Sequence, residues 1–135
     1  MKIGILGAGP AGIFAALKIR NITMNDVYLF DANPGIGRKL STTGSGRCNI
    51  TNLNITPDAY FSFQPADLSS IINRYPPAEI RKILEEEGIP TTATDDGWVY
   101  PLSFSAGNVI QILRDNLLLK GVNLIENTKV LSVQR

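Results

Sequence analysis

The residues with the clearest chemical meaning are three glycines near the start of the chain. Gly7, Gly9 and Gly12 form a G-x-G-x-x-G pattern directly after a short apolar run at 2–6. In such a pattern the first glycine allows a tight turn, the second lets a pyrophosphate approach the backbone, and the third lets a helix pack closely on a sheet. The free N–H groups and positive dipole end of that helix attract a diphosphate. Pro10 suits the first turn of this helix, because its missing N–H would have had no partner there.

A carboxylate follows at the distance that dinucleotide sites require. Asp31 ends the second apolar run, at 26–31, about twenty residues beyond the glycines. An acidic side chain in this place accepts a hydrogen bond from a ribose hydroxyl. The alternative interpretation of the first residues is a secretion signal, but three glycines and Pro10 would break its apolar helix. Strand, turn, helix and carboxylate together therefore predict a dinucleotide site.

The segment after Asp31 carries charge of a single sign. No acidic residue lies between Asp31 and Asp58, and the stretch 37–52 is rich in glycine, serine, threonine and asparagine. Its basic residues are Arg38, Lys39 and Arg47. Cations, hydroxyls and glycine N–H groups suit a second set of contacts to a diphosphate and its attached ring system. The alternative is a mobile polar loop with solvated cations, since loops are polar in general.

The hydrophobic periodicity predicts part of a Rossmann-like α/β fold around these motifs. Strands are expected at 2–6, 26–31 and 122–125, with helices at 10–22 and from Ser105 to Gly121. Right-handed crossovers give the strand order three, two, one. The final residues, 128–135, alternate like a further strand. Because so short a parallel sheet lacks cover on one face, we expect the N-terminal part of a larger protein.

The region 32–104 is expected to be an insertion above the carboxyl ends of the strands. Prolines at 57, 65 and 77 begin helices within it, and the last of these helices ends at Gly88. Its outer face carries Arg81, Lys82 and Glu85. The run Asp95-Asp96-Gly97 lies between two short β-prone segments and predicts a hairpin.

Composition excludes several kinds of function. The 135 residues, 44% of them apolar, suffice for one ordinary core. A net charge of +1 predicts no general attraction to nucleic acid or to an anionic membrane. The chain has no histidine, which excludes histidine triads and histidine zinc sites. The acidic runs 85–87 and 95–96 are expected to be solvated, so no metal site is predicted.

The loop sequence resembles a known family. The run Gly37-Arg-Lys-Leu-Ser-Thr-Thr-Gly-Ser-Gly-Arg-Cys-Asn-Ile-Thr-Asn52, together with the glycine turn and Asp31, is similar to the BaiN-type bacterial flavoproteins. That family is also labelled YhiN-like or aminoacetone-oxidase-family NAD(P)/FAD-dependent oxidoreductases. The likeness continues through Val99–Ala106 and Thr128–Val130. It covers essentially the whole chain, which would correspond to the N-terminal third of a family member.

The resemblance implies FAD held in the manner of glutathione reductase. Residues 1–135 would be the N-terminal part of the FAD-binding domain, with the C-terminal remainder of the family's fold absent. Asp31 would face the adenosine ribose. The residues of the turn that would hold the pyrophosphate are Gly7, Gly9, Pro10, Ala11 and Gly12. Val130 matches a position whose backbone meets the adenine edge. The matching loop residues that continue toward the flavin are Arg38, Lys39, Thr43, Gly46, Arg47 and Asn49.

Cys48 is the only cysteine, so an internal disulfide is excluded and a reducing cytoplasm is expected. A lone cysteine cannot form the redox disulfide of the disulfide reductases. We therefore expect Cys48 to be a small buried packing residue.

The favoured function is the FAD-binding portion of a flavoprotein oxidoreductase that acts on an unknown small molecule, with NAD(P)H as a candidate electron donor. The alternatives are an NAD-binding module of a dehydrogenase or redox sensor, and a non-catalytic nucleotide-binding scaffold. No residue is assigned as a catalytic group, and this chain alone is expected to be inactive. Nucleic acid is not expected as a partner, because the loop cations lack interleaved aromatic residues. The sequence does not indicate an oligomeric state.

Overall fold

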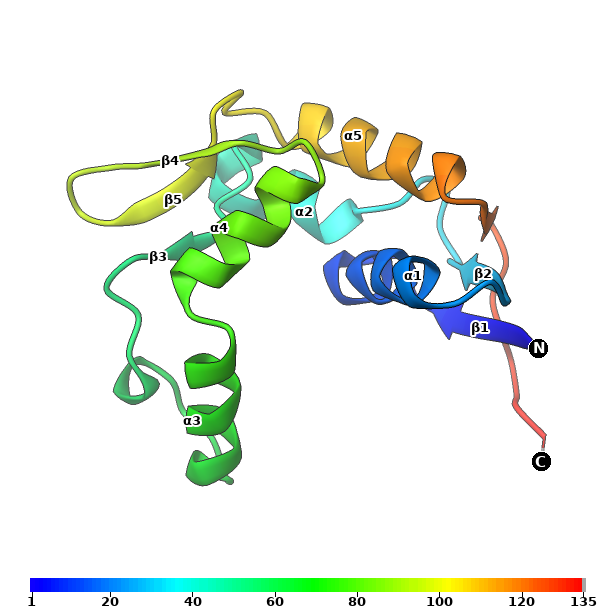
Figure 1. Cartoon of the computed structure of the whole chain (residues 1–135), viewed down its shortest axis with the longest axis horizontal. Coiled ribbons are helices and arrows are strands. Elements are labelled where there is room, and N and C mark those ends of the chain that lie inside the picture. Colours follow the sequence, from blue (N-terminus) through cyan, green and yellow to red (C-terminus); the bar gives the residue numbers. More distant parts are fainter. Residues whose placement is uncertain (135) are drawn as a thin grey trace.

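A three-stranded parallel sheet lies beneath the two longest helices (Figure 1). The structure is a computed structural model that describes residues 1–134, and the side chains of all of these except 65 and 66. β1 (Lys2–Leu6) pairs with β2 (Asp26–Phe30), and β2 pairs with β6 (Val122–Ile125). The predicted strands and their order are confirmed.

Helices α1 (Pro10–Ile22) and α5 (Ala106–Leu119) pack against each other and on this sheet. Both begin as predicted, and the side-chain oxygen of Ser105 accepts a hydrogen bond from the N–H of Asn108 at 3.2 Å. The shared core contains Ile13, Leu17, Val27, Leu29, Val109, Leu113, Leu117 and Val122. Each such side chain contributes roughly 1.5–3 kcal/mol when fully buried. Leu118 of α5 is 52% exposed.

The inserted region carries more regular structure than expected. Its elements are α2 (Arg38–Thr42), the 3₁₀ turns η1 (Thr43–Gly46) and η2 (Pro57–Ala59), β3 (Thr51–Asn52), α3 (Pro65–Arg74), α4 (Pro77–Glu86), β4 (Thr91–Ala93) and β5 (Trp98–Pro101). The predicted hairpin is β4 and β5, and β3 adds to β5 to form a second, antiparallel sheet. In Figure 1 this sheet and α3 lie on the left, away from the first sheet.

Two charged side chains, one in α4 and one directly after it, are less solvated than predicted. Arg81 is half-buried, and its Nε donates to the Thr91 hydroxyl at 2.9 Å. Glu87, from the acidic run 85–87, forms an ion pair with Lys120 at 2.8 Å and accepts from the Asn116 amide. These side chains join α4 to the hairpin and to the end of α5, so tertiary contact overrides the local amphipathic pattern.

The predicted strand at 128–135 is wrong for the residues that the structure describes. Residues 128–134 form no strand. The chain turns at Asn127, with φ of 53°, and the Asn127 and Thr128 N–H groups donate to the carbonyls of Asn33 and Asp31. The segment is thereby tied to the end of β2 instead of to a neighbouring strand. Among the helices described, none is long and apolar enough to cross a membrane.

Candidate functional site

The glycine turn has the geometry that its sequence predicts. Gly7 has φ of +96°, and its N–H donates to the Phe30 carbonyl at 2.8 Å. A Cβ on Gly12 would overlap the carbonyl oxygen of Gly7, so the start of α1 can lie this close only with glycine there. A Cβ on Gly9 would meet nothing within 4 Å, and among the side chains that the structure describes none caps the start of α1. The backbone at Gly9 is therefore open to a ligand.

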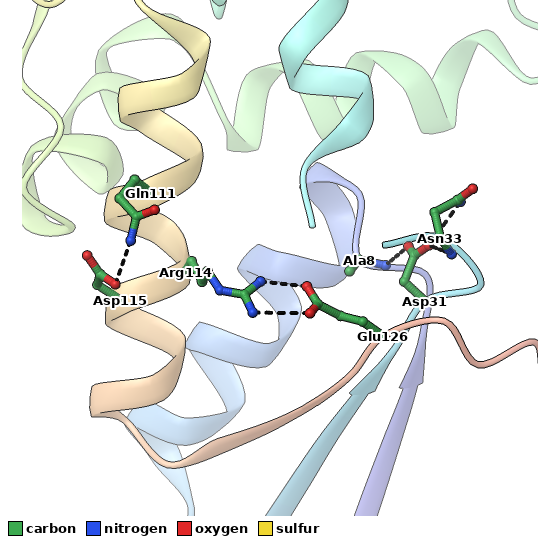
Figure 2. A network of polar contacts seen from close by, with 7 residues as sticks. All are labelled: Ala8, Asp31, Asn33, Gln111, Arg114, Asp115 and Glu126. Atoms are coloured by element: carbon green, nitrogen blue, oxygen red, sulfur yellow. Dashed lines mark hydrogen bonds and ion pairs between the residues drawn. The ribbon is translucent and has the colours of Figure 1, made fainter. Parts of the chain in front are cut away.

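Asp31 is bound to the glycine turn itself (Figure 2). Its Oδ2 accepts from the Ala8 N–H at 2.8 Å, and its Oδ1 accepts from the N–H of Asn33 at 2.8 Å and from the Asn33 amide at 3.0 Å. These bonds, the Asn33 N–H first, hold the pKa of Asp31 below its ordinary value, although burial acts in the opposite direction. The ionised carboxylate thus orders the turn. Its contact with a ribose hydroxyl stays a prediction.

A second carboxylate, Glu126, lies at the end of β6, close to Asp31. Arg114 of α5 donates to both of its oxygens, at 2.5 and 3.1 Å, as Figure 2 shows. This bidentate bond is the main reason why the pKa of Glu126 is lowered, while burial and, to a smaller extent, the nearby Asp31 charge act to raise it. The sequence analysis missed this pair. The available signal was that residues following neighbouring parallel strands meet at one edge of the sheet.

We predict that stability falls in acid through these two carboxylates. Because folding lowers the pKa of Asp31 and Glu126 from 3.8 and 4.5, their stabilising contribution is complete above those values and is lost as the pH falls below them. Urea unfolding of the wild type between pH 3 and 6 should show this loss. Asp31→Asn should have a weaker acid dependence, whereas the control Glu85→Gln, at an exposed position, should behave like the wild type. An unchanged acid dependence in Asp31→Asn would contradict the prediction.

The start of the basic loop is attached to the same turn. The Gly37 N–H donates to the Ala8 carbonyl at 2.8 Å, which places the beginning of α2 beside the glycines. Arg38 is exposed, and its Nη1 donates to the Asn33 side-chain oxygen at 2.7 Å. Lys39 is also exposed, one residue further along α2. Arg38 therefore lies within the group formed by the turn and Asp31, and sequence analysis missed Asn33 as the link.

The second half of the loop packs against β5. The Arg47 guanidinium lies over the Tyr100 ring, 4.9 Å from its centre, and its Nε donates to the Gly44 carbonyl. Cys48 is 1% exposed, as predicted, and burial raises the pKa of its thiol. The packing role of Cys48 is therefore confirmed.

An open groove of about 630 Å³ runs beside this loop. Its lining residues carry no charge and are Thr43, Gly44, Asn49, Ile50, Thr51, Asn52, Asn54, Ile55, Ala59, Tyr60 and Trp98. The side-chain oxygen of Asn49 is buried and has no hydrogen-bond partner among the described residues. Since a buried unpaired acceptor costs ~1–3 kcal/mol, this atom is suited to an N–H donor from a ligand. Trp98 and Tyr60 are 44% and 48% exposed on the groove.

The structure brings part of the predicted site together. The glycine turn, Asp31 and Arg38 form one hydrogen-bonded group, and Thr43 and Asn49 line the groove. Gly46 is exposed in η1, next to Arg47. Val130 is 38% exposed in the final segment, which reaches β2 through Thr128. Over the part of the chain that the structure describes, no cluster of three or more acidic, cysteine or histidine residues is placed to hold a metal.

Comparisons with known proteins add three findings. The family model described as the HI0933-like protein Rossmann domain matches residues 1–135. The chain is 30% identical over 131 residues to the ribosomal RNA dihydrouridine synthase of Haemophilus influenzae, covering 97% of this chain and 32% of that protein. It is 28% identical over 130 residues to the 3-dehydro-bile acid delta(4,6)-reductase of Clostridium scindens, covering 96% and 32%. The chain thus spans about a third of the length of these curated relatives.

Among solved structures, the crystal structure of Thermovibrio ammonificans THI4 is similar in fold. The two superpose with a TM-score of 0.61 at 14% identity, over 93% of this chain and 38% of that one. This likeness supports the Rossmann-like architecture.

Proposed function

Because the chain belongs to the HI0933-like Rossmann-domain family, we propose that it is the N-terminal, FAD-binding part of a flavoprotein oxidoreductase. The observation that carries this proposal is the open backbone at Gly9, at an uncapped helix N-terminus, with the loop cation Arg38 attached to the same turn. Backbone N–H groups, a helix dipole and an arginine are the donors that a diphosphate requires. The single cysteine and the family resemblance further support a bacterial cytoplasmic location.

In this proposal each part of the site has one task. Gly7, Gly9 and Gly12 hold the pyrophosphate at the start of α1. Asp31 faces the adenosine ribose, and the Val130 backbone the adenine. Bound FAD would supply electron transfer, with NAD(P)H as its donor, while the protein orients the ring. The residues proposed to continue from the diphosphate toward the flavin are Arg38, Lys39, Thr43, Gly46, Arg47 and Asn49.

The direct test is a visible absorption spectrum of the purified protein, with and without added FAD. Bands near ~450 nm, and FAD in the supernatant after heating, are expected for a flavoprotein. Thermal stabilisation by FAD but not by NAD would support the same site. Stabilisation by NAD alone would favour the dehydrogenase or sensor alternative. No response to either nucleotide would contradict the proposal.

We predict that Arg47→Ala weakens FAD binding about tenfold, a loss of ~1.4 kcal/mol. The reason is that Tyr100 holds the Arg47 guanidinium in the loop assigned to the flavin end. Arg74→Ala is the matched control, because Arg74 also lies over a tyrosine ring, that of Tyr75 at 5.7 Å, but at the end of α3. Fluorescence titration with FAD measures both variants. Equal affinities would remove the assigned role of Arg47.

The groove favours one candidate substrate. Its lining is uncharged and contains asparagine amides and aromatic rings, and the buried oxygen of the lining residue Asn49 is unpaired among the described residues. A neutral planar ring with an N–H next to a carbonyl matches these groups. The oxygen of an asparagine amide can accept from the ring N–H, and its NH₂ can donate to the ring carbonyl. Uracil has this edge, and its reduction gives the base of dihydrouridine, which the name of the Haemophilus influenzae relative contains. We therefore propose reduction of a uracil-like ring as the candidate reaction.

The only tryptophan, Trp98, lines the groove and can report binding there. Uridine should quench its fluorescence, whereas 3-methyluridine, which lacks the ring N–H, should quench it much less. Asn49→Leu should reduce the uridine response, because it removes the unpaired side-chain oxygen. Because the flavin ring carries a similar N–H, the titration is repeated with FAD bound. If FAD alone quenches Trp98 and blocks uridine, the groove holds the flavin; if neither ligand quenches, the groove assignment is wrong.

A further inference from the structure

A closed ring of hydrogen bonds surrounds the buried Ala8 of the glycine turn. Its N–H donates to Asp31, and its carbonyl accepts from the N–H of Gly37, each at 2.8 Å. Between these two ends, the Asn33 side chain joins Asp31 to Arg38, the residue after Gly37. We call this arrangement the Ala8 ring; its members are Ala8, Asp31, Asn33, Gly37 and Arg38. It connects the predicted phosphate-binding turn directly to the basic loop.

The Asn33 amide fits the Ala8 ring in only one orientation. Its Nδ2 donates to Asp31 Oδ1 at 3.0 Å, and its Oδ1 accepts from Arg38 Nη1 at 2.7 Å. The reverse orientation would place an NH₂ against a guanidinium, which has no acceptor, and an oxygen against a carboxylate. The Asn33 backbone is also held at both ends, by Asp31 Oδ1 and by the Asn127 N–H. Asn33 is therefore a fixed link between the Asp31 carboxylate and the Arg38 guanidinium.

Arg38 keeps most of its binding capacity. A guanidinium has five N–H donors, and the bond to Asn33 uses one of them. The ion pairs found within residues 1–134 do not include Arg38, although its charge helps to lower the pKa of Asp31. An anion at the glycine turn would thus meet a guanidinium whose direction Asn33 sets.

We propose that Asn33 is a positioning residue for the adenosine diphosphate part of the cofactor. It holds Arg38 beside the glycine turn and Asp31 against it, without contacting the ligand itself. The benefit is preorganisation, because an arginine that is already oriented loses less freedom on binding. This inference rests on the proposed function, since it requires an adenine dinucleotide at the turn.

The test is a double-mutant cycle on ADP binding by the purified protein, followed by calorimetry. Asn33→Ala should weaken ADP about fivefold in the wild-type background and less than about twofold when combined with Arg38→Ala. The small remainder is expected because Asp31 keeps its bonds to the Ala8 and Asn33 N–H groups. Asn21→Ala, at an exposed position on α1, is the control and should leave ADP affinity unchanged.

Coupling to Arg38 separates positioning from a general structural effect, which would weaken ADP equally in both backgrounds. An equal loss of ADP affinity in both backgrounds, or an unchanged ADP affinity in Asn33→Ala, would overturn the role of Asn33. Neither result would contradict the proposal that the protein binds FAD. A wild type that binds neither ADP nor FAD would overturn the proposed function as well. The two failures are therefore distinguishable by the wild-type titration.

Discussion

Gly12→Ala is expected to destabilise the protein more than any other single methyl addition at the site, by about 3 kcal/mol. The added Cβ would overlap the Gly7 carbonyl oxygen and approach the Gly7 carbonyl carbon to 3.1 Å and Leu29 Cδ1 to 3.4 Å. The obstacle is backbone, so α1 must move away from the turn and lose contact with the sheet. Urea unfolding followed by circular dichroism measures the loss.

Gly107→Ala is the matched control for this substitution. Gly107 lies in the first turn of α5, and its added Cβ would meet only the Ser105 side chain, at an ordinary 3.8 Å. Alanine is the better helix former, so this variant should be as stable as the wild type or up to about 1 kcal/mol more stable. A Gly12→Ala protein within about 1 kcal/mol of the wild type would show that α1 does not depend on this close approach.

Gly9→Ala, unlike Gly12→Ala, is expected to leave the stability of the protein unchanged. It should reduce the affinity for FAD at least about tenfold. Gly9 has φ of −77°, which alanine adopts freely, and its Cβ would point into open space. That space is where the proposed diphosphate approaches the backbone. The expected loss is therefore a direct obstruction of the ligand.

FAD titration and urea unfolding of the same Gly9→Ala preparation distinguish the two effects. Gly107→Ala again serves as the control and should bind FAD like the wild type. Normal FAD affinity in Gly9→Ala would place the diphosphate elsewhere. A large loss of stability would instead mean that Gly9 has a structural role that its open surroundings do not reveal.

The first sheet was predictable from sequence because its signals are local. A strand, a glycine turn and an amphipathic helix follow one another in residues 2–22, and the same alternation fixes β2, α5 and β6. The final segment, 128–134, was mispredicted because the alternation of apolar and polar residues does not show whether a neighbouring strand is present to pair with it. Its N–H groups at Asn127 and Thr128 pair with carbonyls near the end of β2, which no local pattern indicates.

The candidate site was predictable where one short motif contains it. The glycine turn is such a motif, and Asp31 follows it at the sequence separation that dinucleotide sites require. The pair of Arg114 and Glu126 was missed because it depends on how α5 crosses β6. Asn33 had a usable signal, since Asp-x-Asn followed by proline favours a turn closed by the aspartate side chain. The unpaired oxygen of Asn49 depends on the surrounding loops and has no sequence signature.

The strand order has a consequence for how the chain acquires its structure. The two sides of β2 are joined across very different separations in the chain. Ala8 donates to Asp31, the residue after β2, over 23 residues, whereas Asn123 of β6 donates to Val27 over 96. Closing the longer loop costs about 1.2 kcal/mol more in chain entropy. The glycine turn and Asp31 are also synthesised before β6, and earlier units fold before later ones on the ribosome. The glycine turn is therefore expected to form transiently while β6 is still being synthesised.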